Sequence, residues 1–136
     1  MQYQLYAIIM QKKLNAVKEF HTSFEIGYSQ TPKASLGENK NLLRYNLMKE
    51  ENEEYLEAAQ NNDLTEIADA LGDMLYILCG TIIEHGLQDK IEAVFDEIQR
   101  SNMSKLGADQ KPVYREDGKV MKGPNYFKPD FSKILP

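Results

Sequence analysis

The sequence predicts an all-α protein, a helical bundle of four to five helices followed by a basic loop or β-hairpin tail. Apolar residues recur every three or four positions through most of the first hundred residues, as on one face of a helix. Asp63 is placed as a helix N-cap, with Glu66 three residues later. After Ser101, Gly and Pro interrupt the chain. We therefore expect one domain, with a helical core at about 10–103 and a Gly/Pro-rich tail at about 104–136.

Each expected helix has its own apolar stripe or stop signal. Residues 29–37 form a loop by their Ser, Pro and Gly content, and residues 1–9 are assigned no structure. In the tail, Asp117-Gly118 lies between Val113-Tyr114-Arg115 and Lys119-Val120-Met121, which predicts a small β-hairpin. The expected helices span about residues 10–27, 38–60, 64–85 and 88–101.

Composition narrows the class of protein. The chain has 136 residues, a formal net charge of −5 and one cysteine, Cys79. A lone cysteine excludes an internal disulfide framework and favours a reducing compartment, so we expect a cytoplasmic protein. No apolar run approaches the ~20 residues of a membrane span, and residues 1–10 lack the positive charge of a secretory signal. Mild acidity argues against a nucleic-acid surface, and neither nucleic acid nor membrane is expected as a partner.

The net charge conceals a strong segregation along the chain. Residues 50–73 hold nine acidic side chains and no basic one, whereas residues 1–49 and 100–136 each carry a net charge of +4. On a helical wheel, Glu50 and Glu54 fall on the apolar stripe of the second helix and Glu51 falls beside it. An ordinary amphipathic helix places its acids on the opposite side.

The third expected helix carries Glu66, Asp69 and Asp73 opposite its apolar stripe, which by itself describes a solvated face. However, residues 74–83 are apolar nearly all round, so we expect this half of the helix to be buried on every side. A face that is acidic for one turn and buried in the next indicates a site inside a bundle or at a subunit interface.

Carboxylates gathered in a low-dielectric site are costly unless something compensates their charge. Because residues 50–73 contain no Lys or Arg, two outcomes remain: raised pKa values with proton uptake, or bound metal ions. Oxygen ligands favour hard cations such as Mg²⁺, Mn²⁺ or Ca²⁺, and Mg²⁺ commonly shares substrate phosphates. The two histidines, His21 and His85, are interpreted as structural residues, and Cys79 as a small core residue.

The basic tail interleaves cations with aromatic residues and amides. Such a segment can cover a nucleotide, with Lys and Arg on the phosphates and an aromatic ring on the base. The alternative is a solvated tail that packs loosely on the bundle. The residues that we expect to contact phosphate are Lys105, Lys119 and Lys122, with Asn102, Arg44 and Asn125 as weaker candidates.

Glu50-Glu51-x-x-Glu54 followed by Glu66-x-x-Asp69 resembles the EExxE…ExxD signature of the all-α nucleotide pyrophosphohydrolases. The stretch 66–76 and the tail segment 117–127 (DGKVMKGPNYF) also resemble the phosphoribosyl-ATP-pyrophosphohydrolase-like, MazG-related proteins of this group. The resemblance covers about residues 14–131.

The resemblance implies a helical homodimer or homotetramer that binds Mg²⁺, or Mn²⁺, and converts a nucleoside triphosphate and water to the monophosphate and pyrophosphate. Glu51 or Glu54 would polarise the attacking water. Asp73 and Tyr76 would face the nucleoside, although some relatives place the second acidic pair where Asp73 would be the ligand. The implied metal ligands are Glu50, Glu51, Glu54, Glu66 and Asp69.

The sequence thus predicts a metal-dependent (d)NTP pyrophosphohydrolase that acts in house-cleaning of nucleotide pools. Two alternatives stay open. One is a non-catalytic helical oligomer that binds metal or nucleotide as a sensor or regulatory partner. The other is a structural bundle whose acids are solvated, and it predicts no stabilisation by Mg²⁺.

Overall fold

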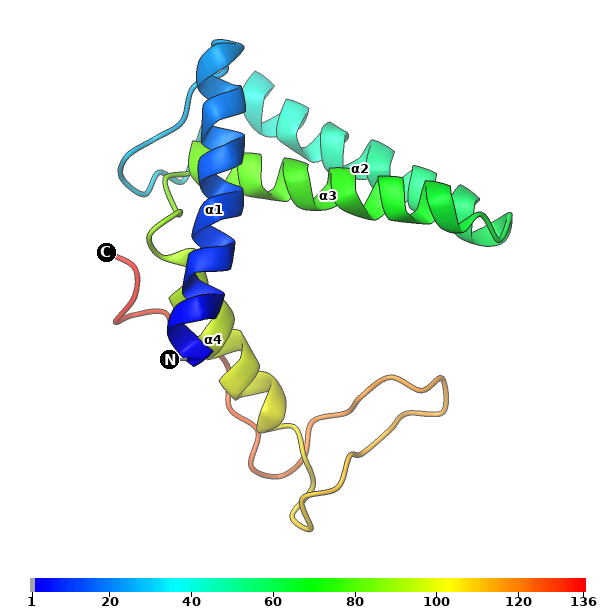
Figure 1. Cartoon of the computed structure of the whole chain (residues 1–136). Coiled ribbons are helices and arrows are strands. Elements are labelled where there is room, and N and C mark those ends of the chain that lie inside the picture. Colours follow the sequence, from blue (N-terminus) through cyan, green and yellow to red (C-terminus); the bar gives the residue numbers. More distant parts are fainter. Residues whose placement is uncertain (1) are drawn as a thin grey trace. The chain divides into compact units, whose positions relative to one another are not determined.

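The computed structural model describes the backbone of residues 2–136 and the side chains of Leu5 and residues 9–136. Its elements are four helices, which bears out the predicted all-α class (Figure 1). The chain divides into two compact units, residues 1–89 and 90–136. None of the helices in the described part of the chain is both long enough and apolar enough to cross a membrane. The helices are α1 (Gln2–Ser23), α2 (Glu38–Gln60), α3 (Leu64–Glu84) and α4 (Ile91–Met103).

The first helix differs from its prediction at both ends. It begins at Gln2 instead of residue 10, in a segment to which the sequence assigned no structure. It ends at Ser23 instead of residue 27, because Glu25 (φ 56°) and Gly27 (φ 87°) turn the backbone into the left-handed region. The amide of Ile26 donates to the carbonyl of His21 over 2.8 Å and closes the turn.

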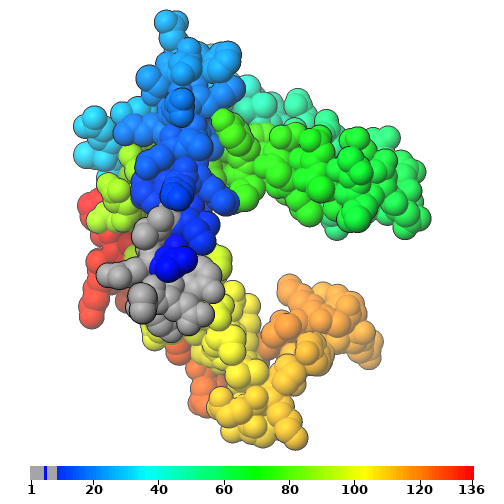
Figure 2. Space-filling view, viewed as in Figure 1, coloured from blue at the N-terminus to red at the C-terminus, as the bar shows by residue number. Residues whose placement is uncertain are grey.

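In the first unit, α2 and α3 lie antiparallel, joined by the turn at Asn61–Asp63 (Figure 1). Asn62 adopts φ 54°, and Asp63 caps α3 by accepting from the amide of Glu66 over 3.2 Å, as the sequence predicted. In the space-filling view the side chains of α2 and α3 form one continuous arm (Figure 2). This hairpin fixes which residues of the two helices face one another.

The core lies where α1 crosses the C-terminal half of α3 (Figure 1). Leu14 and Val17 of α1 are buried there, together with Cys79, Ile82 and Ile83 of α3. Cys79 is thus the core residue that the sequence predicted, and burial raises the pKa of its thiol.

Gly80 allows three helices to meet at one point. A Cβ atom at Gly80 would lie 2.6 Å from Nη2 of Arg44 in α2 and 2.8 Å from Nε2 of His21 in α1. His21 and Arg44 are both buried, and Nδ1 of His21 lies 2.9 Å from the carbonyl oxygen of Gly27. Close packing of this kind has no room for an added methyl group.

The second half of α3 was expected to be buried on every side, and within the first unit it is not. The side chains of Leu75, Tyr76 and Leu78 are 42%, 42% and 44% exposed. The reason is that α1 covers only the C-terminal turns of α3, and α2 covers only one of its faces. These apolar residues therefore remain accessible in a single chain.

The second unit comprises α4 and the tail. The hydroxyl of Ser101 donates to the carbonyl of Phe127 over 2.9 Å, and the amide of Gly123 donates to the carbonyl of Lys105 over 2.8 Å. The turn at Asp117-Gly118 forms as predicted, with a bridge between Tyr114 and Val120. No regular strand is assigned among residues 2–136, so the tail hairpin consists of a turn and a single bridge.

Candidate functional site

The five acids of the predicted metal site lie on the α2–α3 arm. Glu50, Glu51 and Glu54 belong to α2, and Glu66 and Asp69 belong to the first turns of α3. Since α2 and α3 run antiparallel and a short turn joins them, the end of one helix and the start of the other are neighbours. The fold thus brings two separate acidic stretches of the sequence onto one arm.

Glu51 is the acid most affected by this arrangement. Its side chain is half-buried, and its Oε2 atom is buried with no hydrogen-bond partner among the described residues. Burial is the largest cause that raises the pKa of Glu51, and the negative charges of Glu54, Asp73 and Asp69 raise it further. Acids from both helices therefore act on one partly dehydrated carboxylate, which forms no ion pair with any of the described residues.

Two of the predicted ligands also line a cavity of about 350 Å³ near the turn between α2 and α3. These two ligands are Glu54 and Glu66. Glu50 does not line the cavity, and its side chain is exposed. Within residues 9–136, no three Asp, Glu, His or Cys side chains converge tightly enough to hold a metal ion as they stand. The full cavity lining is Glu54, Glu57, Ala58, Asn61, Asp63 and Glu66.

Asp73 belongs to the electrostatic surroundings of Glu51, where it acts more strongly than Asp69. The ExxD motif favoured Asp69, because Ala70 stands three residues before Asp73, and the family resemblance implied that Asp73 faces the nucleoside. The distance between residues on two helices depends on the register of α2 against α3, which no spacing within one helix reveals. Tyr76, the other residue expected to face the nucleoside, packs edge-on against Phe20 of α1, with ring centroids 5.6 Å apart.

Arg44, a weaker candidate for phosphate contact, is only 7% exposed and its guanidinium is occupied. Nε lies 3.0 Å from Oγ1 of Thr81 and 3.1 Å from a carboxylate oxygen of Glu84, while Nη2 donates to the carbonyl of Ile77 over 2.8 Å. Burial lowers the pKa of Arg44, and the Glu84 charge opposes this effect. These contacts give Arg44 a structural role, and a phosphate contact would require it to leave them.

Glu84 completes a buried ion-pair network that sequence reasoning missed. Its side chain is 1% exposed, and Lys40 lies 2.6 Å from its Oε1 atom. The network joins α2 to the last turn of α3 and so fixes how the two helices are placed lengthwise. The sequence signal for this network was the charged Glu84 at the end of an apolar helix. Its partners could not be predicted, because they are about forty residues away in the sequence.

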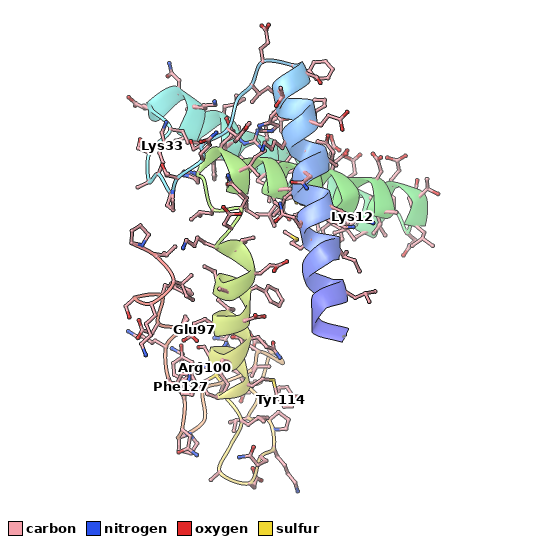
Figure 3. The ribbon with its side chains drawn as sticks, turned by 60° about the vertical axis from the view of Figure 1, so that its left-hand side comes forward. Lys12, Lys33, Glu97, Arg100, Tyr114 and Phe127 are labelled. Carbon is pink, nitrogen blue, oxygen red and sulfur yellow. The ribbon has the colours of Figure 1, made fainter. Side chains whose placement is uncertain are left out.

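The tail cations that were predicted to contact phosphate lie in the second unit. The ammonium of Lys122 lies 4.8 Å from the ring centroid of Tyr126. Arg100 lies 4.3 Å over the ring of Phe127 and is paired with Glu97 over 2.9 Å (Figure 3). Within the described residues, Lys105 and Lys119 form no ion pair. Asn102 and Asn125 are exposed.

Comparison with family models identifies the family of the chain. A family model for phosphoribosyl-ATP pyrophosphohydrolase matches residues 17–102. The chain belongs to this family. The match contains α2, α3 and all five predicted metal ligands. The family belongs to the MazG-like nucleoside triphosphate pyrophosphohydrolase superfamily, as the acidic motifs suggested. No curated protein matches the chain.

Membership establishes the coarse reaction, which is hydrolysis of phosphoanhydride bonds in nucleotides. The acidic arm and a half-buried, uncompensated carboxylate are compatible with that chemistry, since such a reaction needs a group that accepts a proton from water. The roles of individual residues stay predictions.

Proposed function

We propose that this pyrophosphohydrolase cleaves a (deoxy)nucleoside triphosphate to the monophosphate and pyrophosphate with the help of Mg²⁺, and that it serves in house-cleaning of nucleotide pools. The observation that supports the proposal is Glu51. Its carboxylate is half-buried, lies among other acids of α2 and α3, and has a buried oxygen without a partner among the described residues. A carboxylate in this state accepts either a proton or a cation.

The donor atoms suit a hard divalent cation, because all of them are carboxylate oxygens. Mg²⁺ usually keeps several waters and takes only one or two protein carboxylates together with substrate phosphates. It therefore does not require three side chains that already converge. When bound, it would neutralise charge on the phosphates and lower the pKa of a water molecule. The residues that would hold it are Glu50, Glu51, Glu54, Glu66 and Asp69, with Asp73 as a further candidate; Mn²⁺ would fit the same oxygens.

In the proposed mechanism, Glu51 or Glu54 accepts a proton from the attacking water. The water oxygen forms a new bond to phosphorus, the anhydride oxygen between the α- and β-phosphates leaves with its electron pair, and the monophosphate and pyrophosphate separate. A general base works best when its pKa lies near the working pH.

Further residues are proposed to contact the substrate. Lys105, Lys119 and Lys122, assisted by Asn102 and Asn125, would neutralise phosphate charge. Asp73 and Tyr76 would contact the nucleoside.

We also propose that the chain assembles as a homodimer or homotetramer. Leu71, Leu75 and Leu78 of α3 are each more than two-fifths exposed in the single chain, and a second copy would cover them.

The test is to incubate the purified protein with each NTP and dNTP and with phosphoribosyl-ATP, in Mg²⁺, Mn²⁺ or EDTA, and to measure pyrophosphate release. We expect release that depends on metal and falls by at least ~100-fold in Glu54→Gln. Glu53→Gln is the matched control, because Glu53 is an exposed acid of the same helix.

Full activity in Glu54→Gln or in EDTA would refute the proposed mechanism. Nucleotide binding by calorimetry without any product would instead favour a non-catalytic sensor.

A further inference from the structure

The face of α2 that packs on α3 repeats every seven residues. Arg44 and Ala58 are buried on this face, and Glu51, midway between them, is half-buried. Because seven residues make nearly two full turns, these side chains lie on the same side of α2, about 10 Å apart along its axis. Arg44 and Glu51 therefore mark two levels of one helix–helix interface.

On α3 the same two levels are marked by Gly80 and Asp73, which are also seven residues apart. A Cβ atom at Gly80 would lie 2.6 Å from Nη2 of Arg44, so the first level is a direct contact. At the second level, burial, Glu54 and Asp73, in that order, raise the pKa of Glu51, so the Asp73 charge lies near it. Seven residues forward on α2 thus match seven residues backward on α3, as an antiparallel pair requires.

The Arg44 level is fixed along the length of α3. Its guanidinium lies 3.0 Å from Oγ1 of Thr81, 2.8 Å from the carbonyl oxygen of Ile77 and 3.1 Å from a carboxylate oxygen of Glu84. These partners extend over two turns of α3. A shift of α2 by one turn, about 5.4 Å, would break the contacts of a buried charge, which is costly.

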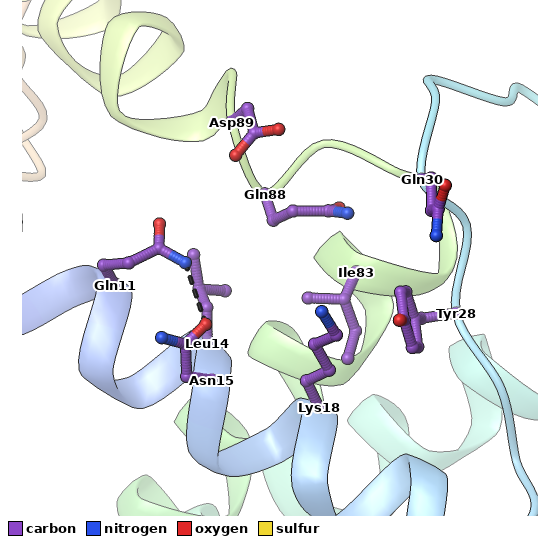
Figure 4. Close-up of a pocket in the computed structure, with 9 residues that line it drawn as sticks. All are labelled: Gln11, Leu14, Asn15, Lys18, Tyr28, Gln30, Ile83, Gln88 and Asp89. Atoms are coloured by element: carbon purple, nitrogen blue, oxygen red, sulfur yellow. Dashed lines mark hydrogen bonds between the residues drawn. The ribbon is translucent and has the colours of Figure 1, made fainter.

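The last turns of α3 are themselves held by other parts of the first unit. Leu14 of α1 and Ile83 of α3 are both buried, and both line a cavity where the two helices cross (Figure 4). The amide of Ser29 donates to the carbonyl of Ile83 over 3.0 Å, and Nε2 of Gln88 donates to the carbonyl of Ser29 over 2.8 Å. Arg44 thus ties α2 to a fixed point of the unit.

Stability alone does not call for an ion pair between Arg44 and Glu84. A buried ion pair is often no more stabilising than apolar residues of the same volume, because its charges lose their hydration. An apolar pair lacks direction, since burial of hydrocarbon is non-directional, whereas the hydrogen bonds of a planar guanidinium require one geometry. The pair is therefore suited to hold one register of α2 on α3.

We propose that Arg44, held by Glu84, is a positioning residue of the candidate active site, which keeps the carboxylates of Glu51 and Asp73 opposed so that they can share one divalent cation. Because Arg44 acts on the acids of the proposed metal site, this role rests on the proposed function. Arg44 itself touches neither the metal nor the phosphates. Residues that orient metal ligands typically change metal affinity or activity by 10–100-fold when they are replaced.

The experiment compares the full-length wild type with Arg44→Met/Glu84→Met, which replaces the ion pair by apolar side chains and leaves the net charge unchanged. Lys40, the other partner of Glu84, is 38% exposed and can be hydrated in this variant. Three quantities are measured: the Mn²⁺ affinity without nucleotide, by electron paramagnetic resonance; the kinetics of pyrophosphate release at saturating Mg²⁺; and the melting temperature, by circular dichroism.

We expect the melting temperature of the double variant to stay within about 5 °C of the wild type. Its Mn²⁺ affinity and kcat should each fall by roughly tenfold or more. KM for the nucleotide should change by less than about threefold, because Arg44 does not contact the substrate.

Lys49→Met/Glu53→Met is the matched control, because it also removes one cation and one anion, both from the exposed surface of α2. It should leave the Mn²⁺ affinity unchanged. Arg44→Lys is a second variant for the case that the double variant does not fold. It keeps a positive charge beside Glu84 but loses the planar fork, so its Mn²⁺ affinity should fall by about threefold or more.

The positioning role is overturned if the folded double variant has the Mn²⁺ affinity and kcat of the wild type, or if only KM rises, which would place Arg44 on the phosphates. If the double variant does not fold, an unchanged Mn²⁺ affinity in Arg44→Lys overturns it. The proposed function fails in a different way: it fails when the wild type itself releases no pyrophosphate, whereas equal activity of the wild type and the double variant refutes the positioning role alone.

Discussion

At Gly80, side chains of α1 and α2 closely approach the backbone of α3, and Gly80→Ala tests how tightly the three helices are fixed. The new Cβ would lie 2.6 Å from Nη2 of Arg44 and 2.8 Å from Nε2 of His21, well inside van der Waals contact. The Arg44 guanidinium cannot move aside cheaply, because it is buried and bound to Thr81, Ile77 and Glu84.

The magnitude follows from two opposing terms. Overpacking of a filled core costs about 1–3 kcal/mol. Replacing glycine by alanine inside a helix returns about 0.5–1 kcal/mol. Gly72→Ala in the same helix isolates the first term, because a Cβ at Gly72 meets no atom within 4 Å. The two variants share the gain in helix propensity, so they should differ by the overpacking term, about 1–3 kcal/mol.

The assay is urea unfolding of the wild type and both variants, followed by circular dichroism at several protein concentrations. Gly72→Ala should be slightly more stable than the wild type, and Gly80→Ala should be less stable. If Gly80→Ala is as stable as Gly72→Ala, the three helices do not pack at this point as described, and the register that brings Glu51 near Asp73 loses its support.

Two further predictions concern the acidic arm and the tail. For Glu51, the folded-state pKa lies above the ordinary 4.5, so the folded protein binds the proton more tightly than the unfolded chain. The protonated Glu51 therefore contributes stability that is lost as pH rises from about 4.5 through the raised pKa. In EDTA, the melting temperature of the wild type should fall over this pH range, and Glu51→Gln should flatten the fall, whereas Glu53→Gln should not. Equal pH profiles for the wild type and Glu51→Gln would contradict the burial of Glu51. For the tail, a Cβ at Gly123 would collide with the backbone carbonyl of Leu106, so Gly123→Ala should open the loop between them and speed limited proteolysis there. Unchanged cleavage, measured by mass spectrometry, would show that Gly123 is not packed in this way.

Local signals were sufficient for most of the fold. The bounds of α2 agree with those predicted, and the Asp63 cap forms with Glu66 as expected. Capping and apolar spacing depend on residues within one turn of each other, so they can be read from sequence. The start of α1 was predicted too late for the same reason, because the sequence of residues 2–9 has no capping residue and no clear amphipathic stripe to mark the start of a helix.

The candidate site could be predicted only in part. The acidic motifs identified the family, which the match over residues 17–102 confirmed. The order of influence on Glu51, with Asp73 ahead of Asp69, could not be read from spacing, because it depends on two helices at once. The structural role of Arg44 was hidden for the same reason, since its partner Glu84 is forty positions away.

By itself, the sequence determined the helices, the acidic character of the arm and the class of reaction, because helix formation and motif spacing are properties of neighbouring residues. Tertiary structure decided which carboxylate is partly buried and which charges surround it. A short turn at Asn61–Asp63 and a buried network around Glu84 set the register of α2 on α3. Electrostatic interactions depend on distance through space, and that register sets the distance between Glu51 and Asp73.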